Sequence, residues 1–185
     1  HIEIRREQIA KPRGNEVLIQ IHAIGICGSD ISYYTKGSTG MGELEYPHIL
    51  GHECAGEVIE VGEECTQLKP GDRVTIEPGV PCGRCEYCRT GRYHLCPSIS
   101  FMSSAVKMPG GEGGMAELVL RPEPFVYKIP ENVTYEQAAL IEPISVAMHA
   151  VEKSGIRPGQ SAAILGCGPI AGCLLLVLKA YGVSK

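Results

Sequence analysis

Four cysteines stand close together in one short stretch of this sequence, in a pattern that suits a metal ion. They are spaced C-x2-C-x2-C-x7-C, at Cys82, Cys85, Cys88 and Cys96. Four thiolates that converge on one centre are a ligand set of tetrahedral zinc, and they leave no coordination position for a substrate. The pattern therefore predicts a structural zinc site. The alternatives are a [4Fe–4S] cluster, whose usual spacings differ from this one, and a loop of free thiols.

Other side chains that could bind a metal are more scattered. Cys27 lies in the stretch G-I-C-G-S-D, and His52 and Glu53 lie in the stretch G-H-E-C-A-G. A single cysteine or histidine is more often packed or hydrogen-bonded inside a fold than bound to a metal. Taken alone, these residues therefore leave both interpretations open.

A glycine-rich turn is the third chemical feature. Gly166-Cys167-Gly168-Pro169-Ile170-Ala171 fits the pattern G-x-G-x-x-G/A, with alanine in the third place. The turn follows a short apolar run at 161–165 and precedes a nearly all-apolar run at 169–181. We therefore predict a strand, a tight turn and a helix, an arrangement that lets the backbone approach a pyrophosphate at the helix N-terminus.

The elements that must position these residues change in type along the chain. Up to about residue 130, short β-rich runs are separated by Gly and Pro turns, which is typical of a small barrel or sandwich. These runs are 16–24, 57–61, 73–77 and 116–121. After Pro130 the spacing of apolar residues predicts a helix over 134–151, followed by the strand and helix around the glycine-rich turn. A doubly wound fold needs several such units, so we expect the second domain to be incomplete at Lys185.

Composition argues against some classes of binding partner and some cellular locations. The net charge is −4, the isoelectric point is near 5.9, and the basic residues are scattered, so nucleic acid is not an expected partner. The most apolar stretch, residues 164–178, is interrupted by glycine and proline and is too short to span a membrane. Nine cysteines without a signal peptide favour a reducing compartment, with the cytoplasm as the default. Because residue 1 is His, a targeting segment removed earlier stays possible.

A family resemblance joins these features. The pattern G-H-E-x-x-G-x5-G-x2-C, from Gly51 to Cys65, resembles the signature of zinc-containing alcohol dehydrogenases. The four-cysteine loop is also similar to that family in spacing and position. The chain thus resembles the medium-chain dehydrogenase/reductases, and C-G-S-D at 27–30 and L-I-E-P-I-S-V at 140–146 resemble the sorbitol (polyol) dehydrogenase branch most closely. The resemblance implies a GroES-like β-barrel catalytic domain over 1–150 and the start of a Rossmann dinucleotide-binding domain over 151–185.

The resemblance also implies an open, catalytic zinc site. Cys27 and His52 would bind the metal, with Glu53 as a ligand or as a partner of one. Glu142 would occupy the place where many alcohol dehydrogenases have a second cysteine, although it could instead cap or pair near a helix start. Ser29 would be the first proton acceptor, or else a turn-capping serine. Two further side chains that would line the substrate pocket, or simply belong to the core, are Tyr33 and Phe101.

The function implied is hydride transfer from a polyol or secondary alcohol to NAD or NADP, with two zinc ions per chain. Contacts to the dinucleotide would come from Gly166, Gly168, Pro169 and Ile170. The family resemblance also implies a homo-oligomer, a tetramer, acting on a small molecule. The alternatives are a related dehydrogenase for threonine or a simple alcohol, and a non-enzymatic zinc module that binds one zinc.

Overall fold

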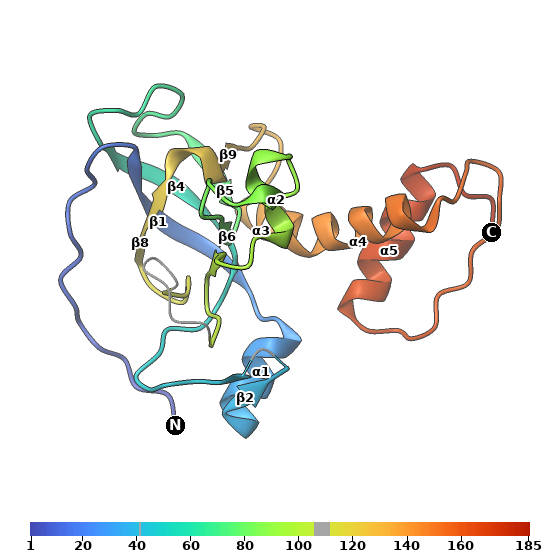
Figure 1. Ribbon diagram of the computed structural model, residues 1–185, viewed down its shortest axis with the longest axis horizontal. Helices are drawn as coiled ribbons and strands as arrows, with labels where there is room; N and C mark the ends of the chain where they lie inside the picture. Colours follow the sequence, from blue (N-terminus) through green and yellow to red (C-terminus); the bar gives the residue numbers. More distant parts are fainter. Residues whose placement is uncertain (41, 106–111) are drawn as a thin grey trace. The chain divides into compact units, whose positions relative to one another are not determined.

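The computed structural model describes residues 1–40, 42–105 and 112–185, which form two compact units. The first unit is His1–Ala139 and the second is Leu140–Lys185. Figure 1 labels most of their helices and strands. The predicted domain division lies between residues 150 and 151, and the assignment of residues 151–185 to a dinucleotide-binding domain stays a prediction.

The first unit holds all the strands that the structure describes, and it is mainly β. Its strands are β1 (Glu16–Gly25), β2 (Ser38–Thr39), β3 (Gly42–Glu43), β4 (Glu53–Val61), β5 (Arg73–Ile76), β6 (Gly79–Val80), β7 (Ser100–Phe101), β8 (Leu118–Pro122) and β9 (Val126–Lys128). Its helices are α1 (Gly28–Lys36), α2 (Glu86–Arg89) and α3 (Tyr135–Ala139), with 3₁₀ turns η1 (Tyr93–Leu95) and η2 (Glu123–Phe125).

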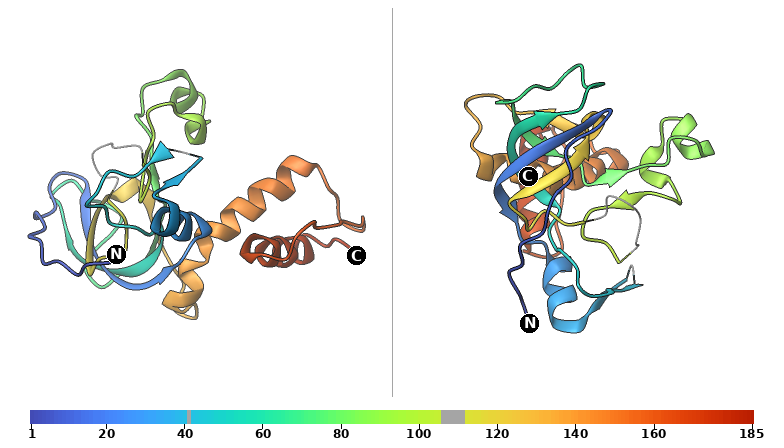
Figure 2. Two further views of the ribbon diagram at one scale, coloured as in Figure 1. Left: turned by 90° about the horizontal axis from the view of Figure 1, so that it is seen from below. Right: turned by 90° about the vertical axis from the view of Figure 1, so that its left-hand side faces the viewer.

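Five of these strands form one antiparallel sheet, in the order β8-β1-β4-β5-β9. The sheet is curled, as the right-hand view of Figure 2 shows. Along β1, Val17 and Ile19 are fully buried while Gln20 and His22 are exposed, so the apolar face of the strand turns into the core. Core residues on β4 and β5, among them Val58 and Val74, pack against that face. The curled sheet therefore encloses one apolar core.

The pairing of β1 with β4 brings two distant turns together. Gly25, at the end of β1, lies opposite Glu53, at the start of β4. The chain segments just beyond these ends carry Cys27 and His52. Close contact between the strands depends on Gly56, because a Cβ there would lie 2.0 Å from the Gln20 carbonyl oxygen. The register of one strand pair thus decides which side chains meet at this edge.

The strands predicted at 16–24, 57–61, 73–77 and 116–121 are confirmed as β1, β4, β5 and β8, although β4 begins earlier, at Glu53. Helix α1 was not predicted. The single helix predicted over 134–151 is instead two helices, α3 and α4 (Ile141–Ser154), with a break at Leu140. None of the helices in the described ranges is long and apolar enough to cross a membrane.

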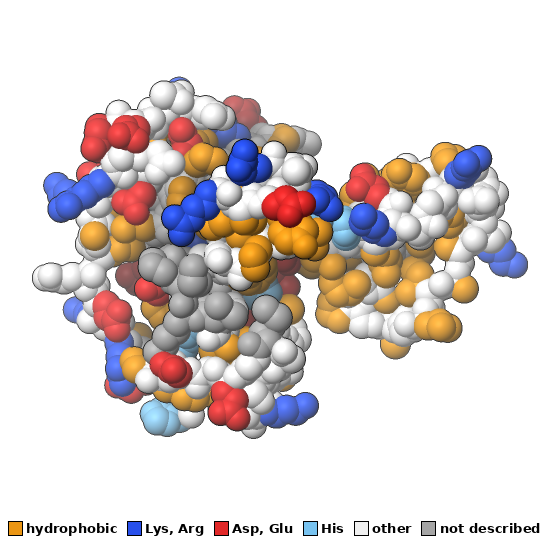
Figure 3. Space-filling view, viewed as in Figure 1, with side chains coloured by type: hydrophobic (Ala, Val, Ile, Leu, Met, Phe, Trp, Pro, Cys, Tyr) orange, Lys and Arg blue, Asp and Glu red, His pale blue; other side chains and the backbone are white. Residues whose placement is uncertain are grey.

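The second unit contains α4 and α5 (Pro169–Ala180), which confirms the helix predicted after the glycine-rich turn. The two helices pack through a small core of Ala147, Val151, Cys173 and Val177. Large apolar side chains also remain exposed on α5, and Figure 3 shows such side chains gathered on the visible face of this unit. A helix that is apolar all round leaves apolar surface uncovered when it has one neighbour.

The strand predicted at 161–165 is wrong for the described structure, which has no strand in this unit. The segment makes one backbone bond to the chain end, from the Ala162 N–H to the Lys185 carbonyl, and the Leu165 side chain is 99% exposed. A strand exists only when a neighbour pairs with it along several residues. An apolar run predicts the tendency to pair but does not supply the neighbour.

Gly56 offers a test of the close approach between β1 and β4. We expect Gly56→Ala to destabilise the protein by about 1–3 kcal/mol, because the new methyl group must displace backbone of β1. The melting temperature measured by circular dichroism should fall by several degrees. The matched control is Gly172→Ala in α5, where a Cβ meets nothing within 4 Å and alanine favours the helix. Equal melting of both variants and wild type would contradict this explanation.

Candidate active site

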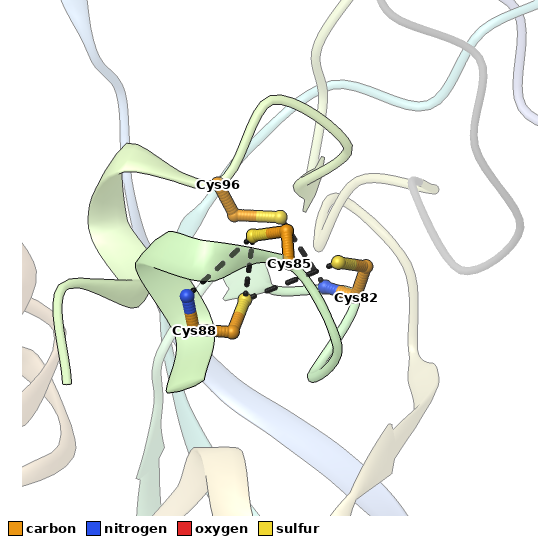
Figure 4. A group of neighbouring side chains, drawn as sticks. All are labelled: Cys82, Cys85, Cys88 and Cys96. Carbon is orange, nitrogen blue, oxygen red and sulfur yellow. Dashed lines mark hydrogen bonds between the residues drawn. The ribbon is translucent and has the colours of Figure 1, made fainter. Parts of the chain in front are cut away.

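The four predicted structural cysteines meet in the loop between β6 and β7 (Figure 4). Their sulfur atoms all lie within 4.8 Å of one another. The Sγ atoms of Cys85 and Cys88 are 3.4 Å apart, and those of Cys82 and Cys88 are 4.0 Å apart. Sulfurs at the corners of a zinc tetrahedron with usual bond lengths lie about 3.8 Å apart. The donor set and its spacing therefore fit a closed tetrahedral metal site.

Local structure prepares these thiols unequally for ionisation. Hydrogen bonds from the backbone N–H groups of Arg84 and Cys85 lower the pKa of the Cys82 thiol to about 6. Desolvation, together with the neighbouring thiols of Cys85 and Cys96, raises the pKa of Cys88 to about 12. Four thiolates this close together need a cation to balance their charge, so metal binding at this loop would release protons.

Cys27, His52 and Glu53 form the second group of possible ligands in the part of the chain that is described. Their ligand atoms also lie within 4.8 Å of one another. Cys27 is the N-cap residue of α1, His52 directly precedes β4, and Glu53 begins β4. His52 and Glu53 are buried, and Gly25 leaves the space that the Glu53 carboxylate occupies. One sulfur, one imidazole nitrogen and one carboxylate oxygen suit a zinc ion with positions left open.

Asp30 holds the two turns of this site together, and the sequence analysis missed that role. Its Oδ2 accepts a hydrogen bond from the Cys27 N–H at 2.9 Å, and its Oδ1 accepts one from the Gly51 N–H at 3.1 Å. The Ser103 hydroxyl also donates to Oδ1, at 3.2 Å. The carboxyl group is buried and lies in the first turn of α1. Only a prediction of α1, with an acid at its third position, could have indicated it.

The same carboxylate lies beside His52. Asp30 Oδ1 is 3.9 Å from His52 Nδ1, a buried nitrogen that has no hydrogen-bond partner in the described structure. A carboxylate next to one ring nitrogen of a histidine orients the ring and favours metal binding through the other nitrogen. The geometry therefore fits a metal bound at Nε2 of His52.

The remaining predicted site residues have different surroundings. The ring centres of Phe101 and His52 are 5.6 Å apart, so Phe101 does lie beside the second ligand group. Ser29 is half-buried in the first turn of α1. Tyr33 is only 3% exposed, and its hydroxyl accepts hydrogen bonds from Thr39 Oγ1 and the Ala105 N–H, as a core side chain does. Glu142 is in the first turn of α4, in the other compact unit, and its role stays a prediction.

The glycine-rich turn leads directly into α5, although the strand predicted before it is absent from the described residues. Gly166 has a φ of 116°, which favours glycine, and Gly168 is the N-cap residue of α5. A Cβ at either glycine would meet nothing within 4 Å, so the backbone is open to approach. Pro169 begins the helix, no side chain caps it, and Ile170 is 43% exposed. These residues fit a pyrophosphate at the helix N-terminus, and their contacts to a cofactor stay a prediction.

Comparisons with known proteins identify the domain that the first unit forms. The alcohol dehydrogenase GroES-like domain matches residues 13–131. The chain is 47% identical to sorbitol dehydrogenase of Bacillus subtilis (strain 168), covering 98% of this chain and 51% of that protein. It is 44% identical to D-xylulose reductase A of Aspergillus niger, covering 92% and 47%. The chain spans about half the length of these curated relatives.

A solved structure supports the same fold. Galactitol-1-phosphate dehydrogenase from Escherichia coli matches with a TM-score of 0.85 at 31% sequence identity. The match covers 98% of this chain and 49% of that one. The predicted GroES-like domain is therefore confirmed, and so are the predicted family and its polyol branch.

Asp30 gives a direct test of the second ligand group. We expect Asp30→Asn to weaken Zn²⁺ binding there by roughly 10–100-fold, because the amide nitrogen cannot accept the backbone hydrogen bonds and the charge beside His52 is lost. Competition with a chromophoric chelator measures the affinity. Asp72→Asn is the matched control, since the Asp72 carboxylate pairs with Lys128 elsewhere on the sheet. Zinc retention that is identical in the two variants would rule out this role of Asp30.

Proposed function

This chain belongs to the zinc-containing medium-chain dehydrogenase/reductases, in the polyol dehydrogenase branch, and on that premise we propose that it is the zinc-binding part of an enzyme that oxidises a polyol or secondary alcohol. The electron acceptor would be NAD or NADP, and the product a ketone. The observation that carries the proposal is the convergence of Cys27, His52 and Glu53 within 4.8 Å. A purely structural zinc module gives no reason for that second group.

In the proposal, two zinc ions have different tasks. The four cysteines of the loop between β6 and β7 would hold one ion in a closed shell. Cys27 and His52 would hold the other, with Glu53 as a further ligand or as a partner of one. When bound at this open group, zinc supplies Lewis-acid chemistry that lowers the pKa of an alcohol hydroxyl.

The side chains around the open group would do the rest. Oxidation of a carbinol removes a hydride from carbon, for which NAD or NADP would supply the acceptor, and a proton from the hydroxyl. Ser29, two residues after Cys27 and half-buried, would receive that proton and pass it towards solvent. Phe101, packed beside His52, would contact the carbon chain of the alcohol and exclude water. Tyr33 would support the substrate pocket without contacting the substrate, because its side chain is buried.

The glycine-rich turn would hold the cofactor. Gly166 and Gly168 would let the backbone approach the pyrophosphate, and Pro169 would fix the first turn of α5. Ile170, which is partly exposed, would contact the dinucleotide from the same turn. The open space around both glycines supports this assignment.

Assembly and location complete the proposal. We expect a homotetramer and a small-molecule substrate, with no nucleic acid or membrane partner. The cytoplasm, a reducing compartment, suits the thiols, because all nine cysteines lie in the described ranges and none forms a disulfide.

The two proposed metal sites can be counted. We expect two zinc ions per chain by elemental analysis, and one in either Cys82→Ser or Cys27→Ser. Cys82→Ser should also lower the melting temperature much more, because a structural zinc site contributes directly to folding free energy. A single zinc that survives Cys82→Ser but not Cys27→Ser would remove the structural site from the proposal.

The activity is tested on the full-length protein with sorbitol, xylitol or 2,3-butanediol and either NAD or NADP. We expect the absorbance of reduced nicotinamide to rise with the polyols. Ser29→Ala should lower kcat by about 100-fold as a proton acceptor is lost, whereas Ser32→Ala, whose hydroxyl bonds to the Gly28 carbonyl within α1, should not. If none of the alcohols is oxidised, the dehydrogenase proposal is wrong. If only butanediol is oxidised, the assignment of a polyol substrate is wrong.

A further inference from the structure

Ser103 is the one residue other than glycine with a positive φ among the described residues, at 60°. It follows β7 and is only 3% exposed. A side chain rarely adopts this backbone conformation unless the surrounding contacts impose it. The contacts of Ser103 therefore indicate which neighbouring groups fix the backbone around it.

The Ser103 hydroxyl is hydrogen-bonded to the Asp30 carboxylate, which lies beside His52. It donates to Asp30 Oδ1 at 3.2 Å, and the same oxygen accepts from the Gly51 N–H at 3.1 Å. The other oxygen of Asp30 accepts from the Cys27 N–H. One carboxylate thus joins the Ser103 segment to the two turns that carry Cys27 and His52.

The segment held in this way carries Phe101. Strand β7 is only two residues long, and Phe101 pairs there with Gly79 of β6. Next along the chain, Met102 is fully buried and its N–H donates to the Pro78 carbonyl. Phe101 is therefore held by β6 on one side and by the hydrogen bond from Ser103 to Asp30 on the other. Its ring lies beside His52, with 5.6 Å between the ring centres.

We propose that Ser103 is a positioning residue that fixes Phe101 beside His52, and that it thereby sets how tightly the carbon chain of the alcohol is bound. The inference rests on the proposed function for its substrate. It assigns Ser103 no contact with the reacting atoms, because the side chain is buried against Asp30. The effect on substrate passes through Phe101.

Substitutions at this position separate the hydroxyl from the backbone conformation. Glycine adopts a positive φ freely but cannot donate the hydrogen bond, while alanine loses the hydroxyl and keeps the strain. An effect of the lost hydroxyl should appear in both Ser103→Gly and Ser103→Ala. An effect of backbone strain should appear in Ser103→Gly alone, because glycine relieves the strain that serine and alanine share.

A fluorescence experiment tests the positioning without any activity. This chain contains no tryptophan, so Phe101→Trp places a reporter at the site, read as a difference from the parent protein. Adding Ser103→Gly should shift the emission to longer wavelength and increase quenching by acrylamide, because the segment is released. Ser32→Ala, whose hydroxyl bonds within α1, should change neither signal. Unchanged emission and quenching after Ser103→Gly would overturn the proposal.

Kinetics on the zinc-loaded, full-length protein test the consequence for substrate. Ser103→Gly should raise KM for the polyol by about tenfold, as expected when a hydrogen bond to a charged group is lost. The value of kcat should stay within about twofold, since the interaction lost is not special to the transition state. Zinc content should not change. An unchanged KM, or a parallel fall of kcat and zinc content, would contradict the proposed role.

A double-mutant cycle shows whether Ser103 acts through Phe101. Phe101→Ala should raise KM by itself, and adding Ser103→Gly to it should raise KM little further. Effects that multiply would overturn the proposed coupling. If wild-type protein oxidises no alcohol, the proposed function fails, whereas the fluorescence experiment still decides the role of Ser103.

Discussion

The buried carboxylate of Asp30 is the interaction on which the rest of the candidate site depends. A buried charge is costly unless it is hydrogen-bonded, and Asp30 receives bonds from Cys27, Gly51 and Ser103, in three separate segments. Each bond to a charged acceptor is stronger than a neutral one. The segments are therefore fixed relative to one another through a single group, which brings the possible ligands together by protein contacts alone.

The sheet makes that convergence possible, because it decides which turns face Asp30. Pairing of β1 with β4 puts Gly25 opposite Glu53, and a shift of one residue would turn every side chain of β4 to the other face. Two glycines, Gly25 and Gly56, have no side chain where the Glu53 carboxylate and the Gln20 carbonyl lie. The packing of β1 against β4 and the hydrogen bonds of Asp30 thus position the same residues, those around Cys27 and His52.

Sequence predicted the local features of this fold well and its long-range features poorly. The four cysteines lie within one loop, so their spacing alone indicated that they meet. Helix α1 was missed because Ile31, Tyr33 and Thr35 have low helix propensity, while the hydrogen bond from the Cys27 N–H to Asp30 stabilises its first turn. The bond from Ser103 to Asp30 joins residues 73 positions apart, and no local pattern indicates such a contact. Pairing is equally non-local, which is why the strand at 161–165 was predicted wrongly.

The closed cysteine group and the open ligand group lie one after the other along the chain. The cysteine loop starts after β6 and ends before β7, and these strands pair over only two residues. So short a ladder cannot hold a loop closed by itself. An ion bound by the four sulfurs would cross-link the loop in addition to the pairing of β6 with β7, and this would reduce the conformational freedom of β7. Because β7 ends at Phe101 and is followed closely by Ser103, a rigid cysteine loop would also help to fix the backbone beside His52. In the proposed enzyme, a zinc ion in the closed cysteine group would therefore support substrate binding through the backbone that leads from the loop to Phe101.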